Sequence, residues 1–266
     1  IFNDVIGPVM RGPSSSHCAA SLRIGRLCRD LMGGDIANIL IEFDPNGSLA
    51  TTHTDQGSDM GLFGGFLGWE AADERLPDAE EHLAQAGISV TINIVDIGAD
   101  HPNTYKITLS NPSETRRLTA ISTGGGMIEV IEIDGAAVSM AGDYFETLVY
   151  CTSPDAVAEL VKSRVAYEDV VVHTPFVEIK TREPLSDEIG GELLAMDGVA
   201  SVTVLSPVLP VLARKEMTVP FITCEEMLAF NEGKDLALWE LAAAYESARG
   251  GITEVEVFEK MRVIVR

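Results

Sequence analysis

Residues 145–205 consist of FETLVYC (145–151), SPDAVAELVKSRV (153–165), DVVVHTPFVEIKT (169–181), SDEIGGELLAMDG (186–198) and VASVTVL (199–205), joined by short links. Runs of β-branched and aromatic residues predict strands in the first, third and last of these segments. Helical spacing of apolar residues predicts helices in the second and fourth. The order β-α-β-(β)-α-β is typical of a split-βαβ, or ferredoxin-like, module.

The sequence before this module predicts a mixed unit of helices and strands. Apolar spacing favours helices over 17–33, 57–69 and 78–87, the first ended by Gly33-Gly34. Runs of alternating or β-branched residues predict strands at 37–44, 89–97, 103–110, 117–124 and 127–135. The fold class is therefore predicted as α+β. We expect domains at 1–143 and 144–212, then a linker and a helical segment at 213–266.

The helical segment at 213–266 has a long helical pattern over 224–248, broken near Gly233, and a further helix that starts at Thr253. The chain opens on Ile1 and stops at Arg266 inside an apolar run, so we expect it to be part of a longer polypeptide.

Bulk composition excludes several classes of protein. The formal net charge of −22 argues against a nucleic-acid partner, because phosphate binding needs a basic surface. With 46% hydrophobic residues but no apolar run of about 18 residues, the chain is expected to be globular and not to span a membrane. An acidic surface without a signal peptide favours a cytoplasmic protein.

The most informative stretch for chemistry is GPSSSHCAASLRIGR, residues 12–26. Ser14, Ser15 and Ser16 stand with His17 at the start of the first predicted helix. A helix N-terminus offers unpaired N–H groups and a positive partial charge, so serine hydroxyls there suit a carboxylate or another anion. The alternative interpretation is that one serine caps the helix and the other two are only solvated.

A second candidate stretch is ATTHTDQGSD, residues 50–59. His53 and Asp55 are separated by one residue, so in a strand both would face the same side, beside Thr54. An imidazole there could act as a general base or orient a substrate group. The alternative is a solvated histidine in a loop.

A third candidate stretch is STGGGMIEV, 122–130, where Gly124 and Gly125 permit close backbone approach to a ligand. A tight hairpin would explain the same glycines. The four cysteines, at positions 18, 28, 151 and 224, have no C-x-x-C spacing, so no metal ligands are predicted from this chain.

Together these stretches resemble the iron–sulfur-dependent L-serine dehydratase family. Its β domain carries G-P-S-S-S-H-T, G-H-G-T-D-x-A, D-E-R-x-P-D, H-P-N-T and S-I-G-G-G elements. The counterparts here, in the same order, are Gly12–His17, His53–Asp55, Asp73–Asp78, His101–Thr104 and Ser122–Gly126. The region 220–266 resembles the start of the family's α, or catalytic, region.

The resemblance implies an L-serine ammonia-lyase that forms pyruvate and ammonia with a [4Fe–4S] cluster, whose ligands would lie outside this chain. The α region would follow in the same polypeptide or come from a separate subunit, and a homodimer is expected. Ser14, Ser15 and Ser16 would bind the substrate carboxylate, and His17 and His53 would position groups or transfer a proton. Thr54, Asp55, Gly124 and Gly125 would complete the substrate-binding set.

Residues 145–212 resemble, more loosely, the ACT regulatory domain of some family members. The family's D-x-P-G effector turn corresponds to Thr152–Ala156, which lacks the glycine, so a scaffold or a dimer interface is the favoured role. Cys18 replaces a family threonine, and the G-H-G-T-D form is altered. A lyase acting on another β-hydroxy or β-substituted amino acid, a non-catalytic amino-acid-binding module and a structural assembly subunit remain the alternatives.

Overall fold

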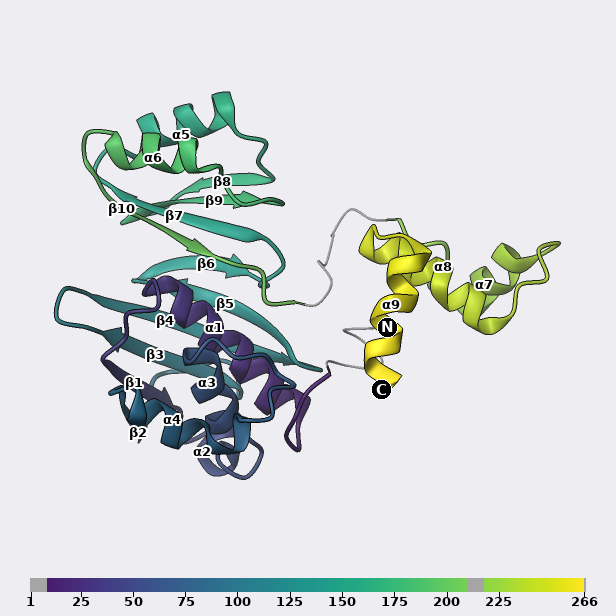
Figure 1. The fold of residues 1–266 in the computed structure, drawn as a ribbon, viewed down its shortest axis with the longest axis horizontal. Coiled ribbons are helices and arrows are strands. Elements are labelled where there is room, and N and C mark those ends of the chain that lie inside the picture. The colour runs from purple at the N-terminus through teal and green to yellow at the C-terminus, as the bar shows by residue number, and fades with distance from the viewer. Residues whose placement is uncertain (1–8, 210–217, 266) are drawn as a thin grey trace. The chain divides into compact units, whose positions relative to one another are not determined.

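The computed structural model describes residues 9–209 and 218–265, which divide into a larger unit over Met10–Leu209 and a smaller unit that contains 218–265 (Figure 1). Each unit is described by itself. Residues 1–8 and part of the expected linker, 213–217, lie outside the described residues. The mixture of helices and largely antiparallel strands in the larger unit confirms the predicted α+β class.

The first sheet lies within residues 38–140 and has the strand order β2-β1-β3-β4-β5-β6. Its strands are β1 (Asn38–Phe43), β2 (Ser89–Ile94), β3 (Thr104–Ser110), β4 (Thr115–Gly124), β5 (Met127–Ile133) and β6 (Ala136–Met140). The pair β1–β2 is parallel and the other neighbours are antiparallel. Strand β6 was not predicted, because AAVSM is short and lacks a clear alternating pattern.

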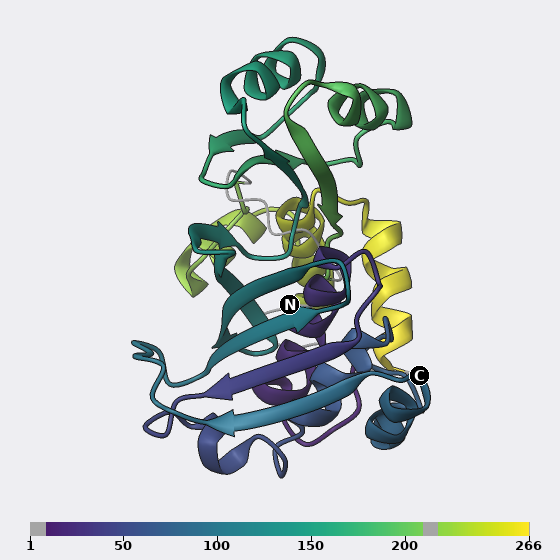
Figure 2. The same cartoon turned by 90° about the vertical axis from the view of Figure 1, so that its left-hand side faces the viewer.

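Helices cover one face of this sheet, as Figure 2 shows with the strands in front and the helices behind. In chain order they are η1 (Ser15–Ala19), α1 (Ala20–Leu31), α2 (Leu49–Thr52), α3 (Ser58–Phe66), η2 (Leu76–Asp78) and α4 (Ala79–Gln85). Every second side chain of β3, from Tyr105 to Leu109, is fully buried in the core beneath them. The helices predicted over 17–33, 57–69 and 78–87 are all confirmed.

Helices α1 and α3 cross in close contact because glycines face each other at the crossing. A Cβ built on Gly25 would lie 2.5 Å from the carbonyl oxygen of Leu62, and one built on Gly65 would lie 2.8 Å from the amide nitrogen of Arg26. Side chains larger than hydrogen would separate the two backbones. This crossing therefore fixes the start of α1 relative to the start of α3.

The second sheet, within residues 145–205, has the order β10-β7-β9-β8 and is antiparallel throughout. Its elements are β7 (Phe145–Cys151), α5 (Pro154–Arg164), β8 (Asp169–Val172), β9 (Phe176–Thr181), α6 (Asp187–Ala195) and β10 (Val199–Leu205). This is the predicted βαββαβ order of elements. One face packs on α5 and α6 around Val149 and Val177, whereas Leu148 and Phe176 on the other face join the core of the first sheet.

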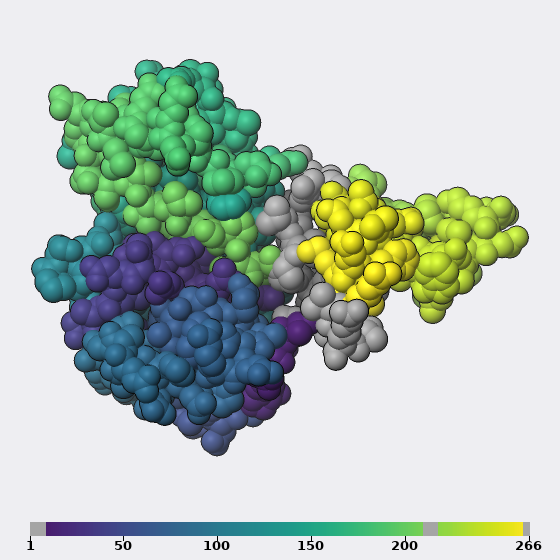
Figure 3. Space-filling model, in the orientation of Figure 1, coloured from purple at the N-terminus to yellow at the C-terminus, as the bar shows by residue number. Residues whose placement is uncertain are grey.

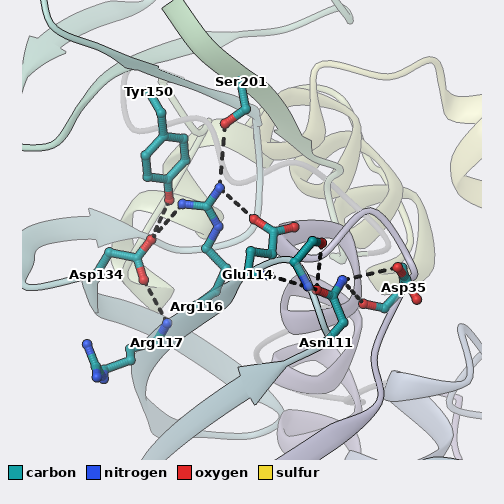
Figure 4. Close-up of polar contacts among 9 residues, drawn as sticks. Asp35, Asn111, Glu114, Arg116, Arg117, Asp134, Tyr150 and Ser201 are labelled. Carbon is teal, nitrogen blue, oxygen red and sulfur yellow. Dashed lines mark hydrogen bonds and ion pairs between the residues drawn. The ribbon is translucent and has the colours of Figure 1, made fainter.

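The residues of the two sheets lie against each other in the larger unit (Figure 3), and polar groups join them directly (Figure 4). The guanidinium of Arg116 on β4 lies 3.9 Å from the ring centroid of Tyr150 on β7. It pairs with Asp134 at 3.3 Å and with Glu114 at 2.8 Å. The Tyr150 hydroxyl donates to Asp134 at 2.7 Å, so one carboxylate serves both sheets.

Replacing Arg116 with alanine is expected to lower the free energy of unfolding of the chain by about 2 kcal/mol. The desolvated cation–π contact contributes about 1–2 kcal/mol, and a partly buried ion pair adds up to about 1 kcal/mol. Urea unfolding monitored by circular dichroism measures the change. Arg117→Ala is the matched control, because the Arg117 side chain is exposed and points away from this contact (Figure 4). Equal urea midpoints for Arg116→Ala and Arg117→Ala would contradict a stabilising role of Arg116 between the two sheets.

The described part of the smaller unit is helical, with α7 (Cys224–Asn231), α8 (Leu238–Gly250) and α9 (Glu254–Val265). The helical pattern predicted over 224–248, broken near Gly233, is confirmed. Thr223 and Glu226 form a capping box at the start of α7. Throughout the described residues, the helices are too short or too polar to cross a membrane.

Candidate functional site

The segment Ser14–Ala19 begins the first helix with a wide turn. Ser14 has an extended backbone, and Ser15–Ala19 is wound as a π-helix that continues into α1. The Ser14 side chain makes no capping hydrogen bond to the helix backbone. The interpretation that a serine merely caps this helix is therefore not supported. Single π turns are frequent at functional sites, and this one turns Ser14, Ser16 and His17 toward one another.

His17 is held at both ring nitrogens. Its Nδ1 lies 3.1 Å from the hydroxyl of Ser14 and 3.3 Å from that of Ser16, and its Nε2 lies 3.3 Å from the hydroxyl of Thr52. The Thr52 hydroxyl donates its hydrogen to the carbonyl of Ser48 at 2.7 Å. The Thr52 oxygen can then only accept, so Nε2 carries the hydrogen and Nδ1 accepts from a serine.

Burial lowers the pKa of His17 below its ordinary value of 6.5. The neutral imidazole is therefore favoured at pH 7, in agreement with an Nδ1 that accepts a hydrogen bond. Ser15 is half-buried beside this group, and the contacts to the imidazole come from Ser14 and Ser16.

This shift predicts how stability depends on pH. Above pH 6.5 the imidazole of His17 is neutral in both the folded and the unfolded chain. As the pH falls through 6.5, the unfolded chain binds the proton first, so the free energy of unfolding decreases. NMR titration should give His17 a pKa below 6.5, and His17→Gln should remove part of the acid-side loss of stability. A pKa at or above 6.5 would contradict the effect of burial.

The segment from Thr52 to Asp59 forms the second half of the site, and it is not a strand. His53 ends the short helix α2, and a turn leads to α3. The prediction that His53 and Asp55 share a face is therefore wrong, and Asp55 is exposed in the turn. The chain folds back here because the backbone N–H groups of Ser58 and Asp59 both donate to the carbonyl of His53.

The acid beside His53 is Asp59, which the sequence analysis missed. Nδ1 of His53 lies 2.8 Å from each carboxylate oxygen of Asp59. The hydroxyl of Thr54 donates to the same carboxylate at 2.8 Å, so Thr54 supports the pair. The ring of His53 packs against Phe43 at the end of β1, with 5.2 Å between centroids. The imidazole remains 20% exposed and its Nε2 is on the edge away from Asp59.

The glycine-rich turn between β4 and β5 meets the helix start. The hydroxyl of Ser122 donates to the carbonyl of Ser16 at 2.7 Å, and the buried guanidinium of Arg23 donates to the carbonyl of Gly126. Gly124 and Gly125, with φ of 102° and 61°, form the turn itself. Only glycine adopts such angles readily, so this turn brings bare backbone next to the serines.

The His101–Thr104 element fixes the position of α2. Ser48, which precedes α2, donates its N–H to the carbonyl of Pro102 at 2.8 Å and its hydroxyl to the side-chain oxygen of Asn103. Asn103 also accepts the N–H of Ser122 at 3.1 Å through its carbonyl. Thr52, Ser122 and Asn103 were not predicted as site residues. They link the four short polar segments of the larger unit into one connected group.

Cys18 contributes differently from what was expected. Its side chain is fully buried, and its thiol donates to the carbonyl of Arg11 at 2.9 Å. The residue that replaces the family threonine therefore lies in the core, out of reach of a substrate at the surface. Burial raises the pKa of the Cys18 thiol to about 11 and that of Cys28 further still, so both stay protonated at neutral pH.

No group of three histidine, cysteine, aspartate or glutamate side chains that could hold a metal occurs in residues 9–209 and 218–265. An iron–sulfur cluster needs closely grouped thiolates, whereas the cysteines here are separate, and the two in α1 and its first turn are buried thiols. The described residues therefore do not fit a [4Fe–4S] cluster.

Comparison with known proteins identifies the family of the chain. No family model matches the chain. A Bacillus subtilis (strain 168) protein named "Probable L-serine dehydratase, beta chain" is 41% identical over 146 residues, which cover 55% of this chain and 66% of that protein. The "L-serine dehydratase, beta chain" of Peptoniphilus asaccharolyticus is 33% identical over 162 residues, 60% of this chain and 72% of that protein. The chain thus spans about two thirds of each relative, and it belongs to the L-serine dehydratase β chain family.

Proposed function

We propose that this chain is the β part of an L-serine ammonia-lyase, which converts L-serine to pyruvate and ammonia. The relatives named as β chains of L-serine dehydratase support the reaction and the substrate. The observation that carries the proposal is the connection between the serine-lined turn and the second histidine. Nε2 of His17 contacts Thr52, and Thr52 precedes His53 directly, so the serine-lined turn lies next to the segment that carries the second imidazole.

The Ser14–Ser16 turn would bind the substrate carboxylate. Ser14 and Ser16 also contact each other at 3.1 Å, and Nδ1 of His17 can accept only one hydrogen. One hydroxyl therefore donates to Nδ1 and the other donates to the neighbouring serine, and it is this second hydrogen that would turn to a carboxylate oxygen when substrate binds. The N–H groups at the start of the helix belong to the same turn, and the Ser122 hydroxyl ties the glycine-rich turn to it through the carbonyl of Ser16. This arrangement suits an amino acid held by its carboxylate.

The proposed reaction is an elimination followed by hydrolysis. A base takes the proton from Cα, the electron pair forms the Cα–Cβ double bond, and the bond from Cβ to the hydroxyl oxygen breaks. The departing hydroxide takes up the proton and leaves as water. The 2-aminoacrylate that remains tautomerises to an imine, and water hydrolyses it to pyruvate and ammonia. The imidazoles of His17 and His53 are the groups of this chain that we propose for proton transfer.

The remainder of the active site would come from an α region, either a separate subunit, as the names of the two β-chain relatives suggest, or a continuation of this polypeptide. The resemblance places the [4Fe–4S] ligands in that region. The steps proposed for this chain, binding the carboxylate and moving the proton, require only its own residues.

Pyruvate release from L-serine by the complete enzyme, this chain with its α region prepared without oxygen, tests the proposal. We expect turnover with L-serine and weaker turnover with other β-hydroxy amino acids. Enzyme with an intact cluster that releases no keto acid from any of them would disprove it. Calorimetry of this chain alone with L-serine distinguishes the lyase from a regulatory amino-acid-binding module. Tight binding of L-serine without the α region would favour the regulatory module.

For the second sheet and its helices we propose a scaffold role, in an ACT-like module. The βαββαβ order and the sheet order β10-β7-β9-β8 support the likeness. At the turn where such domains bind effectors, Thr152 and Ser153 lead directly into Pro154 at the start of α5. The Thr152 N–H donates to the carbonyl of Gly198, which occupies a backbone group that an effector would use.

A further inference from the structure

We propose that Asp59 is a positioning residue that fixes the tautomer of His53, and that His53 is thereby the base that removes the Cα proton. The inference rests on the proposed function and goes further, since it assigns different roles to the two imidazoles. It also moves the acidic member of the site from Asp55, which the motif suggested, to Asp59.

The first step of the argument is the geometry of the pair. Both carboxylate oxygens of Asp59 lie 2.8 Å from the same nitrogen, Nδ1 of His53. An ionised carboxylate only accepts hydrogen bonds, so Nδ1 must carry a hydrogen. In the neutral ring the lone pair is then on Nε2. A base oriented by a third group in this way is the usual arrangement for proton transfer in enzymes.

The carboxylate is itself held in place. The Thr54 hydroxyl donates to Oδ2 of Asp59 at 2.8 Å, and the Asp59 side chain is only 15% exposed. On its other side, the ring of His53 rests against Phe43, which is fully buried. The Phe43 ring and the Asp59 carboxylate therefore fix the orientation of the imidazole. The edge of the ring that contacts neither of them bears Nε2.

His17 differs at each of these points. Both of its nitrogens are already in hydrogen bonds, with Nε2 donating to Thr52 and Nδ1 accepting from Ser14 or Ser16. Its lone pair is directed at the serine hydroxyls. His17 therefore orders the carboxylate-binding hydroxyls, whereas Nε2 of His53 has no hydrogen-bond partner among the described residues and is available for the substrate.

The test begins with the chain alone. Long-range ¹⁵N–¹H NMR at a pH where the imidazoles are neutral distinguishes a protonated from an unprotonated ring nitrogen. We expect His53 to carry its hydrogen on Nδ1 and His17 to carry its hydrogen on Nε2. In Asp59→Asn the preference of His53 should be lost, because an amide can donate as well as accept, and His17 should be unchanged. Asp59→Glu, which keeps a carboxylate, should retain the Nδ1 hydrogen.

The second part uses the complete enzyme. Asp59→Asn should lower kcat for L-serine roughly 10- to 100-fold with little change in KM, because the base is misoriented while carboxylate binding remains. Combined with His53→Ala it should cost no more than His53→Ala alone, since the two residues act as a unit. Asp197→Asn, in an exposed turn of the second sheet module, is the matched control and should be unchanged.

The two parts fail in different ways. His53 with its hydrogen on Nε2, or an Asp59→Asn variant with an unaltered tautomer or an unaltered kcat, would overturn the inference. An intact wild-type enzyme that releases no pyruvate would instead disprove the proposed function. The NMR result would still decide whether Asp59 sets the tautomer, because it requires no turnover.

Discussion

Replacing His53 with alanine is expected to lower kcat of the complete enzyme for L-serine by about 10²-fold or more. General-base catalysis contributes about 10² to 10⁴ to a rate, and removal of the imidazole takes from the Asp59 carboxylate the partner that it orients, although the Thr54 hydroxyl still donates to it. Binding of the carboxylate by the Ser14–Ser16 turn should persist, so KM should change far less than kcat. Steady-state kinetics of pyruvate release measures both constants.

His17→Ala provides the comparison for this result. It removes the partner of the serine hydroxyls and of Thr52, so it should act mainly on KM. The thermal unfolding midpoint of each variant shows whether the substitution also destabilises the folded chain. If His53→Ala retains turnover within a few-fold of wild type, His53 takes no part in proton transfer, whatever the effect of His17→Ala.

Replacing Gly65 with alanine is expected to lower the free energy of unfolding of the chain by about 3 kcal/mol, at the upper end of the range for overpacking. The new methyl group would lie 2.8 Å from both the amide nitrogen of Arg26 and the Cα of Gly25. Those atoms belong to backbone, which cannot rotate away as a side chain can. Helices α1 and α3 would have to separate.

Gly191→Ala is the matched control for this substitution. Gly191 is also within a helix, α6, but nothing lies within 4 Å of the position its Cβ would take. Because glycine is a poor helix former, alanine there should raise stability by about 0.5–1 kcal/mol. Chemical unfolding of the three proteins, wild type and the two variants, gives both changes. A Gly65→Ala variant as stable as Gly191→Ala would contradict the close crossing.

The sequence predicted the framework well because the elements there are long and periodic. Over 145–205, segments with strand composition alternate with segments of helical spacing, and their order was predicted correctly, although the segment 169–181 contains two strands, β8 and β9. Ser14 to His17 at the start of the first helix were also placed correctly, since Gly-Pro, three serines and an apolar run define a helix start. What this could not reveal is the π turn, because no local pattern distinguishes it from an ordinary first turn.

The segment around His53 was predicted wrongly for a physical reason. Helix α2 has only four residues, Leu-Ala-Thr-Thr, and threonines favour strands, so tertiary contacts rather than propensity form it. The pairing of His53 with Asp59 depends on a tight turn between them. The family's G-H-G-T-D form also fits Asp55–Asp59, whose last two residues begin α3, and then its acid is Asp59 and Gln56 stands at its histidine. The start of α3 was the signal for that alignment.

The π turn at Ser15–Ala19 makes the spacing of this segment sensitive to length. The close contact of Gly25 with α3 fixes the orientation of α1. The extra residue of the π turn lets the chain enter α1 in that orientation while the hydroxyls of Ser14 and Ser16 still reach the imidazole of His17. Deleting one serine would restore ordinary winding and change the angles at which the side chains of this turn leave the helix, so the hydroxyls would no longer meet Nδ1 of His17 as they do here. The number of consecutive serines therefore matters as well as their hydroxyls. Replacing one serine with alanine would disturb the geometry of the site less than deleting it.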